Sequence, residues 1–254
     1  MLASGAKQQG TPMPDETFRG GTPAPAQIRA DAEAVMDVLA GGGVGIIPLD
    51  VAYGIIGTSA GAIRRIFEAK SRSYDKPSGM FSNWRLSSEI HVLPPDRHQI
   101  ARRMVEEVGL PYSIVAPFRA EHPLMQAADP FVLKNSSKAG TIDMLLNAGP
   151  FHDAIAGLAA ERMSPVFGSS ANASMKGSKY SLEEIDAPVR AAADIAFDYG
   201  RSKYANEYGH SSTIIDFADW TVIRVGVEYE KLAAGFRDLF GIELIVTGNT
   251  TMVV

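Results

Sequence analysis

Lys70 and Arg72 are the first residues of this chain whose types and spacing suggest ligand chemistry. In an extended segment, positions i and i+2 point their side chains in the same direction, so the two cations would face one ligand. An apolar strand at 44–47 and a turn that holds Asp50 and Tyr53 precede them. A strand, a small-residue turn and a helix ending in two cations form a suitable floor for a phosphate or carboxylate. The competing interpretation is an ordinary strand–loop–helix unit, because basic residues near a helix C-terminus also interact with the helix dipole.

A run of small polar residues at 168–172 forms a second candidate site. It follows a short buried strand, where small residues let the backbone approach a ligand closely. Ser170 and Asn172 supply neutral hydrogen-bond donors suited to phosphate or carboxylate oxygens. A helix N-terminus directly after them would add partial positive charge. The competing interpretation is that these side chains only cap or turn the chain.

A third group combines the hydroxyls of Ser212 and Thr213 with Arg224 on the following strand. Hydroxyls before a strand are usually turn residues, and one arginine on an edge strand is usually solvated. Alone, this group says little about function. It gains meaning from its order in the chain relative to the first two groups.

The hydrophobic patterns predict the elements that would position these residues. Helices are expected at 27–40, through Ile63, Ile66 and Phe67, at 95–108, at 150–163, in part at 182–193, and at 228–240. Strands are expected at 44–47, 79–81, 113–116, 141–146, 165–168, 195–197, 212–217, 220–225 and 242–246, with a long loop at 119–140. Because some of these strands are linked directly as hairpins, we expect an α/β fold with a mixed sheet.

The chain has no internal repeat and no clear linker, so we expect one domain at 26–254, with a C-terminal helix–strand extension after residue 227. Residues 1–25 are rich in Gly, Pro, Thr and Gln, and we expect them to be disordered or loosely attached. The oligomeric state is open, with a homodimer among the options.

Composition excludes several classes of function. The chain has 254 residues, 46% of them hydrophobic and 21% charged, which is typical of a soluble globular protein. It has no cysteine, so disulfides, thiolate metal sites and a cysteine nucleophile are excluded. No stretch resembles a membrane span or a signal peptide, and we expect a cytoplasmic protein. The net charge of −5 does not favour nucleic acid as the main ligand, although a local basic groove is compatible with it.

Five short motifs, taken in order, resemble the YrdC-like family. They are Pro-x-Asp-x-x-Tyr-Gly, Lys-x-Arg with a proline five residues on, Ser-Ala-Asn, Ser-Thr-Ile-Ile-Asp and Ile-Arg-x-Gly, and the resemblance covers residues 27–227. The resemblance implies a twisted, open, mixed α/β sheet with flanking helices and a concave active surface. Members of the family are typically nucleotidyltransferases that join bicarbonate, L-threonine and ATP into L-threonylcarbamoyladenylate for tRNA modification. The same domain handles carbamoyl-adenylate in hydrogenase-maturation and antibiotic carbamoyltransferases, and its concave surface is linked to double-stranded RNA.

The resemblance also implies roles for individual residues. Lys70 and Arg72 would bind the ATP phosphates and stabilise the leaving pyrophosphate. The other nucleotide-side positions would be Thr141, Ser170, Asn172 and Arg224. The acceptor-side positions would be Asp50, Tyr53, Ser212 and Thr213. Mg²⁺ would be held through the ATP phosphates, with no protein ligand to the metal.

The sequence departs from the family mainly on the acceptor side. Leu49 and Val51 replace two threonines of the first motif, and Leu145 stands where the family has an arginine suited to a carboxylate. The family's Trp-Pro-Gly-Pro-Leu-Thr stretch is reduced to the sequence at 109–113. Losing the arginine would remove a strong charge-assisted pair, so we expect L-threonine to be bound poorly unless another cation compensates. Candidates in the long loop are Arg119, Lys134 and Lys138.

Three functions therefore remain open. The chain is a threonylcarbamoyl-adenylate synthase, a related adenylate-forming enzyme with a different and more apolar acceptor, or a module that binds nucleotide or RNA without turnover. The retained Lys70, Arg72, Ser170 and Asn172 favour the two enzymes.

Overall fold

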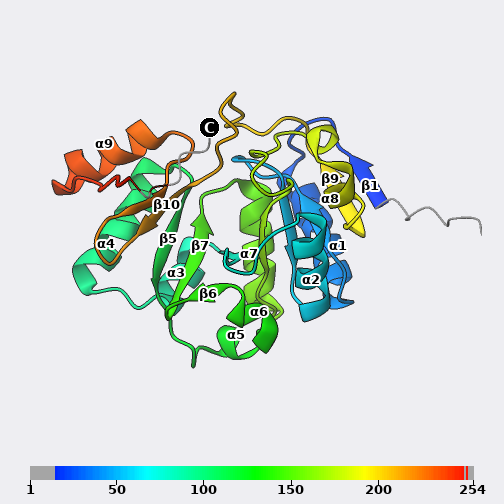
Figure 1. Ribbon diagram of the computed structural model, residues 1–254, viewed down its shortest axis with the longest axis horizontal. Helices are drawn as coiled ribbons and strands as arrows, with labels where there is room; N and C mark the ends of the chain where they lie inside the picture. Colours follow the sequence, from blue (N-terminus) through cyan, green and yellow to red (C-terminus); the bar gives the residue numbers. More distant parts are fainter. Residues whose placement is uncertain (1–14, 249, 251–254) are drawn as a thin grey trace, which may run out of the picture.

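The computed structural model describes residues 15–248 and residue 250, and one mixed β-sheet forms its centre (Figure 1). Its strands are β1 (Asp15–Phe18), β2 (Gly45–Ile47), β3 (Gly54–Gly57), β4 (Gly79–Phe81), β5 (Tyr112–Pro117), β6 (Ser137–Lys138), β7 (Thr141–Leu146), β8 (Phe167–Ser170), β9 (Ile195–Asp198), β10 (Thr213–Asp216) and β11 (Val222–Arg224). The order across the sheet is β1-β9-β2-β3-β8-β4-β7-β5-β10-β11, and β6 pairs with β7. The pairs β1–β9, β9–β2, β4–β7 and β5–β10 are parallel, whereas the others are antiparallel. The predicted α/β class with an open mixed sheet is confirmed.

Helices cover both faces of the sheet. They are α1 (Pro25–Ala40), α2 (Ala60–Ala69), α3 (Trp84–Ile90), α4 (Pro95–Arg103), α5 (Pro123–Gln126), α6 (Pro130–Lys134), α7 (Pro150–Glu161), α8 (Ala187–Arg190) and α9 (Tyr229–Phe240), with a π-helical turn at Met104–Val108 and a 3₁₀ turn at Leu182–Glu184. Helices α1 and α7 share one apolar core with β2, β3 and β9. Helices α2, α3, α5 and α6 pack on the opposite face, and α4 and α9 pack on that face beside β5 and β10. Figure 1 shows α4 and α9 at one end of the molecule and α1, α2 and α8 at the other.

Strand β7 shows how the sheet leaves one area open. Ile142, Met144 and Leu146 are buried in the cores formed with α2, α3 and α4. The alternate residues Asp143 and Leu145 must therefore face the other side. On that side α1 and α7 cover the strands around β2 and β3, so the surface over β5, β7 and β10 forms a cleft.

Several elements differ from the prediction. Residues 15–18 were expected to be loosely attached, but they form β1, which pairs with β9 and is held by the ion pair between Glu16 and Arg190. Residues 1–14 lie outside the described residues. Strand β3 was missed because two glycines bound it. Gly54 serves close packing there, since a Cβ would lie 3.1 Å from the ring of Phe81.

The expected loop at 119–140 contains α5, α6 and β6. Its prolines suggested irregular chain, but Pro123 and Pro130 stand in the first turn of the two helices, where proline is well tolerated. Helix α3 was also missed. The expected final strand at 242–246 is reduced to one bridge between Ile245 and Thr221. No helix in the described ranges is long and apolar enough to cross a lipid bilayer.

Candidate functional site

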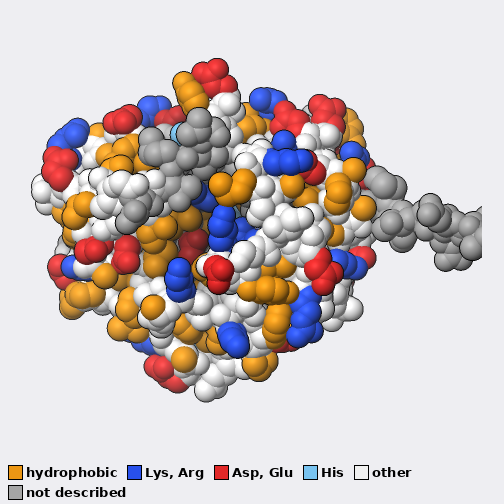
Figure 2. Space-filling model, in the orientation of Figure 1, with side chains coloured by type: hydrophobic (Ala, Val, Ile, Leu, Met, Phe, Trp, Pro, Cys, Tyr) orange, Lys and Arg blue, Asp and Glu red, His pale blue; other side chains and the backbone are white. Residues whose placement is uncertain are grey.

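The cleft over β5, β7 and β10 contains about 670 Å³ of empty space, counted together with the open solvent at its mouth. Figure 2 shows this face hollowed near its centre, with basic side chains gathered around the hollow. The polar residues that line the cleft are Tyr53, Arg72, Ser113, Asp143, Ser169, Ser170, Ser211, Ser212 and Arg224. Its apolar lining comes mainly from Leu49, Val51, Met80, Phe81, Leu145 and Ile214. The cleft thus has a charged part and an apolar part.

Lys70 lies beneath the cleft rather than in its wall. It caps the C-terminus of α2, and its side chain is only 1% exposed. The Nζ donates hydrogen bonds to the backbone carbonyls of Ser170 and Asn172, the latter at 2.6 Å. Burial, and then the nearby Arg72, lower the pKa of Lys70 to about 7. The ammonium therefore ties the end of α2 to the loop after β8.

The segment at 70–72 is not extended, which corrects the geometry expected from the sequence. Lys70 is in the right-handed helical region and Ser71 has φ of 49°. Arg72 consequently lines the cleft while Lys70 stays below it. The Arg72 guanidinium donates to the carbonyls of Lys76 at 3.1 Å and Pro77 at 2.7 Å. Burial, followed by the charge of the nearby Arg224, lowers the pKa of Arg72 to about 10.

Arg224 reaches the cleft from β11. Its Nε and Nη2 donate to the carbonyl oxygen of Ser212 at 3.0 and 2.6 Å, and Nη2 also donates to the Ser212 hydroxyl at 3.1 Å. The antiparallel pairing of β10 and β11 brings these two residues together. Burial lowers the pKa of Arg224, and Asp143 opposes that shift. Two guanidinium groups that are far apart in the sequence thus lie in one cleft.

Asp143 is the functional candidate that the sequence analysis missed. It lines the cleft from β7, and its carboxylate accepts a hydrogen bond from Ser113 on β5. Burial raises its pKa, whereas Arg224 and Arg72 act in the opposite direction. Its Oδ1 atom is buried and has no hydrogen-bond partner among the described residues. The sequence feature that could have indicated Asp143 is that it is the one charged residue in the otherwise uncharged strand at 141–146.

Ser170 and Asn172 lie at the end of β8, as predicted. The Ser170 hydroxyl lines the cleft and donates to the Asn172 side-chain oxygen. The Asn172 amide donates to the carbonyl of Ala173 at 2.7 Å. Asn172 is 7% exposed and supports the cleft from below, together with Lys70.

Three residues predicted at the site have their hydroxyls bound elsewhere, although Tyr53 itself is among the residues that line the cleft. The Tyr53 hydroxyl donates toward Asp198 at 2.6 Å and the Gly200 carbonyl at 2.8 Å, so it ties this loop to the end of β9. The Thr213 hydroxyl is fully buried and accepts from the Gly226 amide at 3.0 Å. The Thr141 hydroxyl donates to the Lys138 carbonyl at 2.8 Å, and Thr141 is not among the residues that line the cleft.

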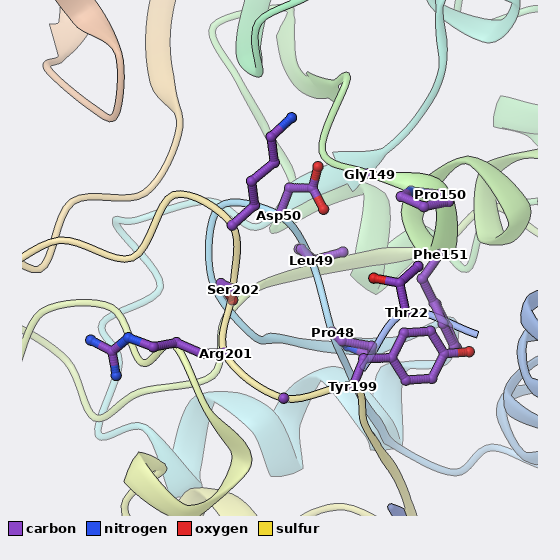
Figure 3. A pocket seen from close by; sticks show the side chains of 12 residues that line it. Thr22, Pro48, Leu49, Asp50, Gly149, Pro150, Phe151, Tyr199, Arg201 and Ser202 are labelled. Carbon is purple, nitrogen blue, oxygen red and sulfur yellow. The ribbon is translucent and has the colours of Figure 1, made fainter. Parts of the chain in front are cut away.

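Asp50 also lies outside the cleft, in a neighbouring pocket that shares only Leu49 with it. Figure 3 shows Asp50 beside Gly149 and Pro150 at the start of α7, with Arg201 pointing away from the pocket. A Cβ on Gly149 would lie 2.4 Å from the Asp50 carboxylate, so this close approach requires glycine. Burial raises the pKa of Asp50, and Lys203 opposes that shift.

The apolar substitutions do meet in the cleft. Leu49, Val51 and Leu145 all line it, next to Phe81. None of the three cations expected to compensate, Arg119, Lys134 and Lys138, is among the cleft residues. The Arg119 guanidinium instead donates to the backbone carbonyls of residues 89 and 91 at 2.8 Å. The expected compensation from this part of the chain is therefore wrong in the described structure.

Comparison with known proteins identifies the class. The Sua5/YciO/YrdC family model, described as "Telomere recombination", matches residues 37–226. The chain therefore belongs to the Sua5/YciO/YrdC family. No curated protein matches it.

Solved structures share the fold at low sequence identity. A hypothetical protein, smu.1377c, from Streptococcus mutans has a TM-score of 0.72 at 18% identity, with 91% of this chain and 97% of that chain covered. Sua5 of P. abyssi, solved in complex with L-threonine, has a TM-score of 0.64 at 19% identity over 96% of this chain and 68% of that one. Full-length HypF in its phosphate- and nucleotide-bound form has a TM-score of 0.54 at 14% identity over 74% of this chain and 27% of that one. At these identities the likeness supports the fold alone.

Proposed function

We propose that the cleft binds ATP and forms a carbamoyl-adenylate from ATP, bicarbonate and an acceptor amine. The observation that carries this proposal is the convergence of Arg72 and Arg224 on one cleft whose polar wall also holds the hydroxyls of Ser170 and Ser212. Guanidinium groups bind phosphate oxygens well, and hydroxyls supply further donors. The nucleotide-bound HypF structure and the threonine complex of P. abyssi Sua5 agree with this proposal for members of the same fold.

The reaction depends on the positioning of the substrates and needs no nucleophile from the protein. The amine and bicarbonate combine to a carbamate with loss of water. A carbamate oxygen then attacks the α-phosphate of ATP, and pyrophosphate leaves as the bond to the β-phosphate breaks. Arg72 and Arg224 would stabilise the charge that develops on the phosphates.

In this proposal Mg²⁺ accompanies ATP. The described residues contain no group of three or more His, Asp or Glu side chains placed to hold a metal ion. The triphosphate itself would supply the metal's oxygen ligands, as is usual for Mg²⁺ in nucleotide sites. When bound, the ion neutralises phosphate charge.

L-threonine is the acceptor that the family resemblance implies. A second candidate function, the same reaction with a different acceptor, is supported by Leu49, Val51 and Leu145 in the cleft wall. ATP–pyrophosphate exchange in bicarbonate buffer with a panel of amino acids tests both. Robust threonine-dependent exchange at micromolar concentrations supports the first candidate, exchange with larger apolar amino acids supports the second, and no exchange with any amine contradicts both.

ATP with Mg²⁺ should bind and raise the melting temperature, because a ligand that binds only the native state stabilises it. Arg72→Ala should weaken ATP binding about tenfold or more, since it removes hydrogen bonds to a charged group. The unliganded fold should survive, because the hydrogen bonds of the Arg72 guanidinium go to the carbonyls of residues 76–77 within its own loop, and its other contact is with the ring of Phe67, 5.6 Å away. Calorimetric titration measures the affinity.

Arg85→Ala is the matched control, because this side chain is 76% exposed and pairs with Glu89 on the same helix. It should leave ATP affinity unchanged. Equal ATP affinity in the Arg72→Ala variant and the wild type would remove Arg72 from the site.

A further inference from the structure

Asp143 is a carboxylate without a full set of partners inside the cleft. Its Oδ1 is buried and unpaired among the described residues, although two guanidinium groups are close enough to affect its pKa. Neither arginine forms an ion pair with it within 4 Å in the part of the chain that the structure describes. The guanidinium groups instead donate to carbonyl oxygens, at 76–77 for Arg72 and at Ser212 for Arg224. Asp143 therefore lines the cleft with one carboxylate oxygen that has no hydrogen-bond partner among the described residues.

The neighbourhood of Asp143 is apolar along its own strand. Leu145 lies two residues further on the same face of β7, and it lines the cleft with Leu49 and Val51. Gly79 on the adjacent β4 leaves room for the carboxylate, since a Cβ there would lie 3.3 Å from Oδ2. A carboxylate with one unpaired oxygen and an apolar wall thus lie side by side.

We propose that Asp143 binds the amino group of the acceptor and that Leu49, Val51 and Leu145 contact its apolar part. The acceptor is then a primary amine with an apolar substituent, a class that includes the apolar α-amino acids. A carboxylate with free lone pairs forms strong charge-assisted hydrogen bonds with an ammonium group. Burial of a hydrocarbon side chain against the apolar wall favours binding, whereas these three side chains form no hydrogen bond with a threonine hydroxyl. This inference rests on the proposed function, because it assigns the acceptor of that reaction.

The test compares L-leucine with 4-methylpentanoate, which has the same carbon skeleton and carboxylate but no amino group. Each is titrated calorimetrically into the protein saturated with Mg²⁺ and α,β-methylene-ATP, which cannot release pyrophosphate. The wild type should bind leucine about tenfold to a hundredfold more tightly, the range expected for hydrogen bonds to a charged group. Asp143→Asn should abolish that preference, measured in the variant saturated with the ATP analogue.

Asp153→Asn is the matched control, because that carboxylate is 61% exposed on α7 and does not line the cleft. It should keep the preference for leucine. A wild type that binds both compounds equally overturns the proposal without any variant, so the test stands even if Asp143→Asn fails to fold. A preference that survives in Asp143→Asn overturns it too.

A metal role for Asp143 is the remaining alternative. If Asp143→Asn weakens Mn²⁺ binding to the complex with the ATP analogue, measured by electron paramagnetic resonance, and keeps the preference for leucine, the carboxylate is a metal ligand and the proposal is wrong. Failure of the proposed function has a different signature. The ATP analogue would then not bind or raise the melting temperature of the wild type.

Discussion

The basic group of Lys70 is buried, and its burial makes the free energy of unfolding depend on pH. Its pKa falls from 10.5 to about 7 in the folded protein, chiefly through burial. Between these values the unfolded chain holds the proton more tightly than the folded chain. The free energy of unfolding should therefore rise with pH across this window, by up to about 1.4 kcal/mol per pH unit, and the full destabilisation is present below pH 7.

Urea unfolding at pH 7, 8 and 9 measures this slope. Lys70→Met should flatten it, whatever it does to the absolute stability through the lost hydrogen bonds to residues 170 and 172. Lys138→Met is the control, since Lys138 is exposed. Identical slopes in the wild type and Lys70→Met would show that Lys70 is charged in both states.

At the residue scale, the sequence predicted which cationic and hydroxyl residues share the cleft better than it predicted their hydrogen-bond partners. Arg72, Ser170, Ser212 and Arg224 do share one cleft. The Tyr53 hydroxyl does not point into the cleft, because it forms hydrogen bonds with Asp198 and Gly200 at the end of β9, far away in the sequence. The partner of a hydroxyl depends on tertiary neighbours, which a local motif does not contain.

Gly168 shows how tightly the central strands are packed. It lies on β8 between β3 and β4, and a Cβ there would lie 2.1 Å from the carbonyl oxygen of Ile55. Gly168→Ala must therefore displace backbone, and we expect it to lower the free energy of unfolding by about 3 kcal/mol or more. Urea denaturation measures the change.

The matched control is Gly157→Ala. Gly157 lies within α7, and a Cβ there meets nothing within 4 Å. Alanine should raise the free energy of unfolding by up to about 1 kcal/mol, because it has the higher helix propensity. A mild effect of Gly168→Ala, similar in size to that of the control, would contradict the close pairing of β8 with β3.

At the element scale, long periodic segments were predictable and short ones were not. The helices α1, α4, α7 and α9 carry enough turns to show a 3.6-residue period, and all four were predicted close to their bounds. Strand β3 has four residues, two of them glycine, and α5 has four residues, the first of them proline. Such segments form because neighbours supply hydrogen bonds and packing, so their own sequence carries little periodic signal.

At the scale of the whole molecule, helices cover one end of this face of the sheet, and the other end carries the cleft. Helices α1 and α7 build a core over β2, β3 and β9, and the other end of that face remains open as the cleft. The chain order of the motifs predicted this shared site through the family resemblance. Hydrophobic patterns alone could not, because the residues come from strands far apart in sequence that meet only through the strand order.

Charge at this scale argues against double-stranded RNA as a tight ligand. The net charge is −5, and exposed arginines on the outer helices are paired, as Arg85 is with Glu89, Arg102 with Glu106 and Arg103 with Glu107. We therefore expect a 20-base-pair RNA to bind no more tightly than the roughly 10⁻⁶–10⁻⁴ M of nonspecific complexes at physiological salt. Fluorescence anisotropy at several salt concentrations measures this.

A variant in which Glu106 and Glu107 are replaced by glutamine frees two of these arginines and should strengthen RNA binding modestly, with a steeper dependence on salt, because more phosphate contacts release more counterions. The same variant should bind ATP as the wild type does, since neither glutamate lines the cleft. Submicromolar RNA binding by the wild type at physiological salt would instead favour the module that binds RNA without turnover, because a local basic surface would then have overcome the net negative charge.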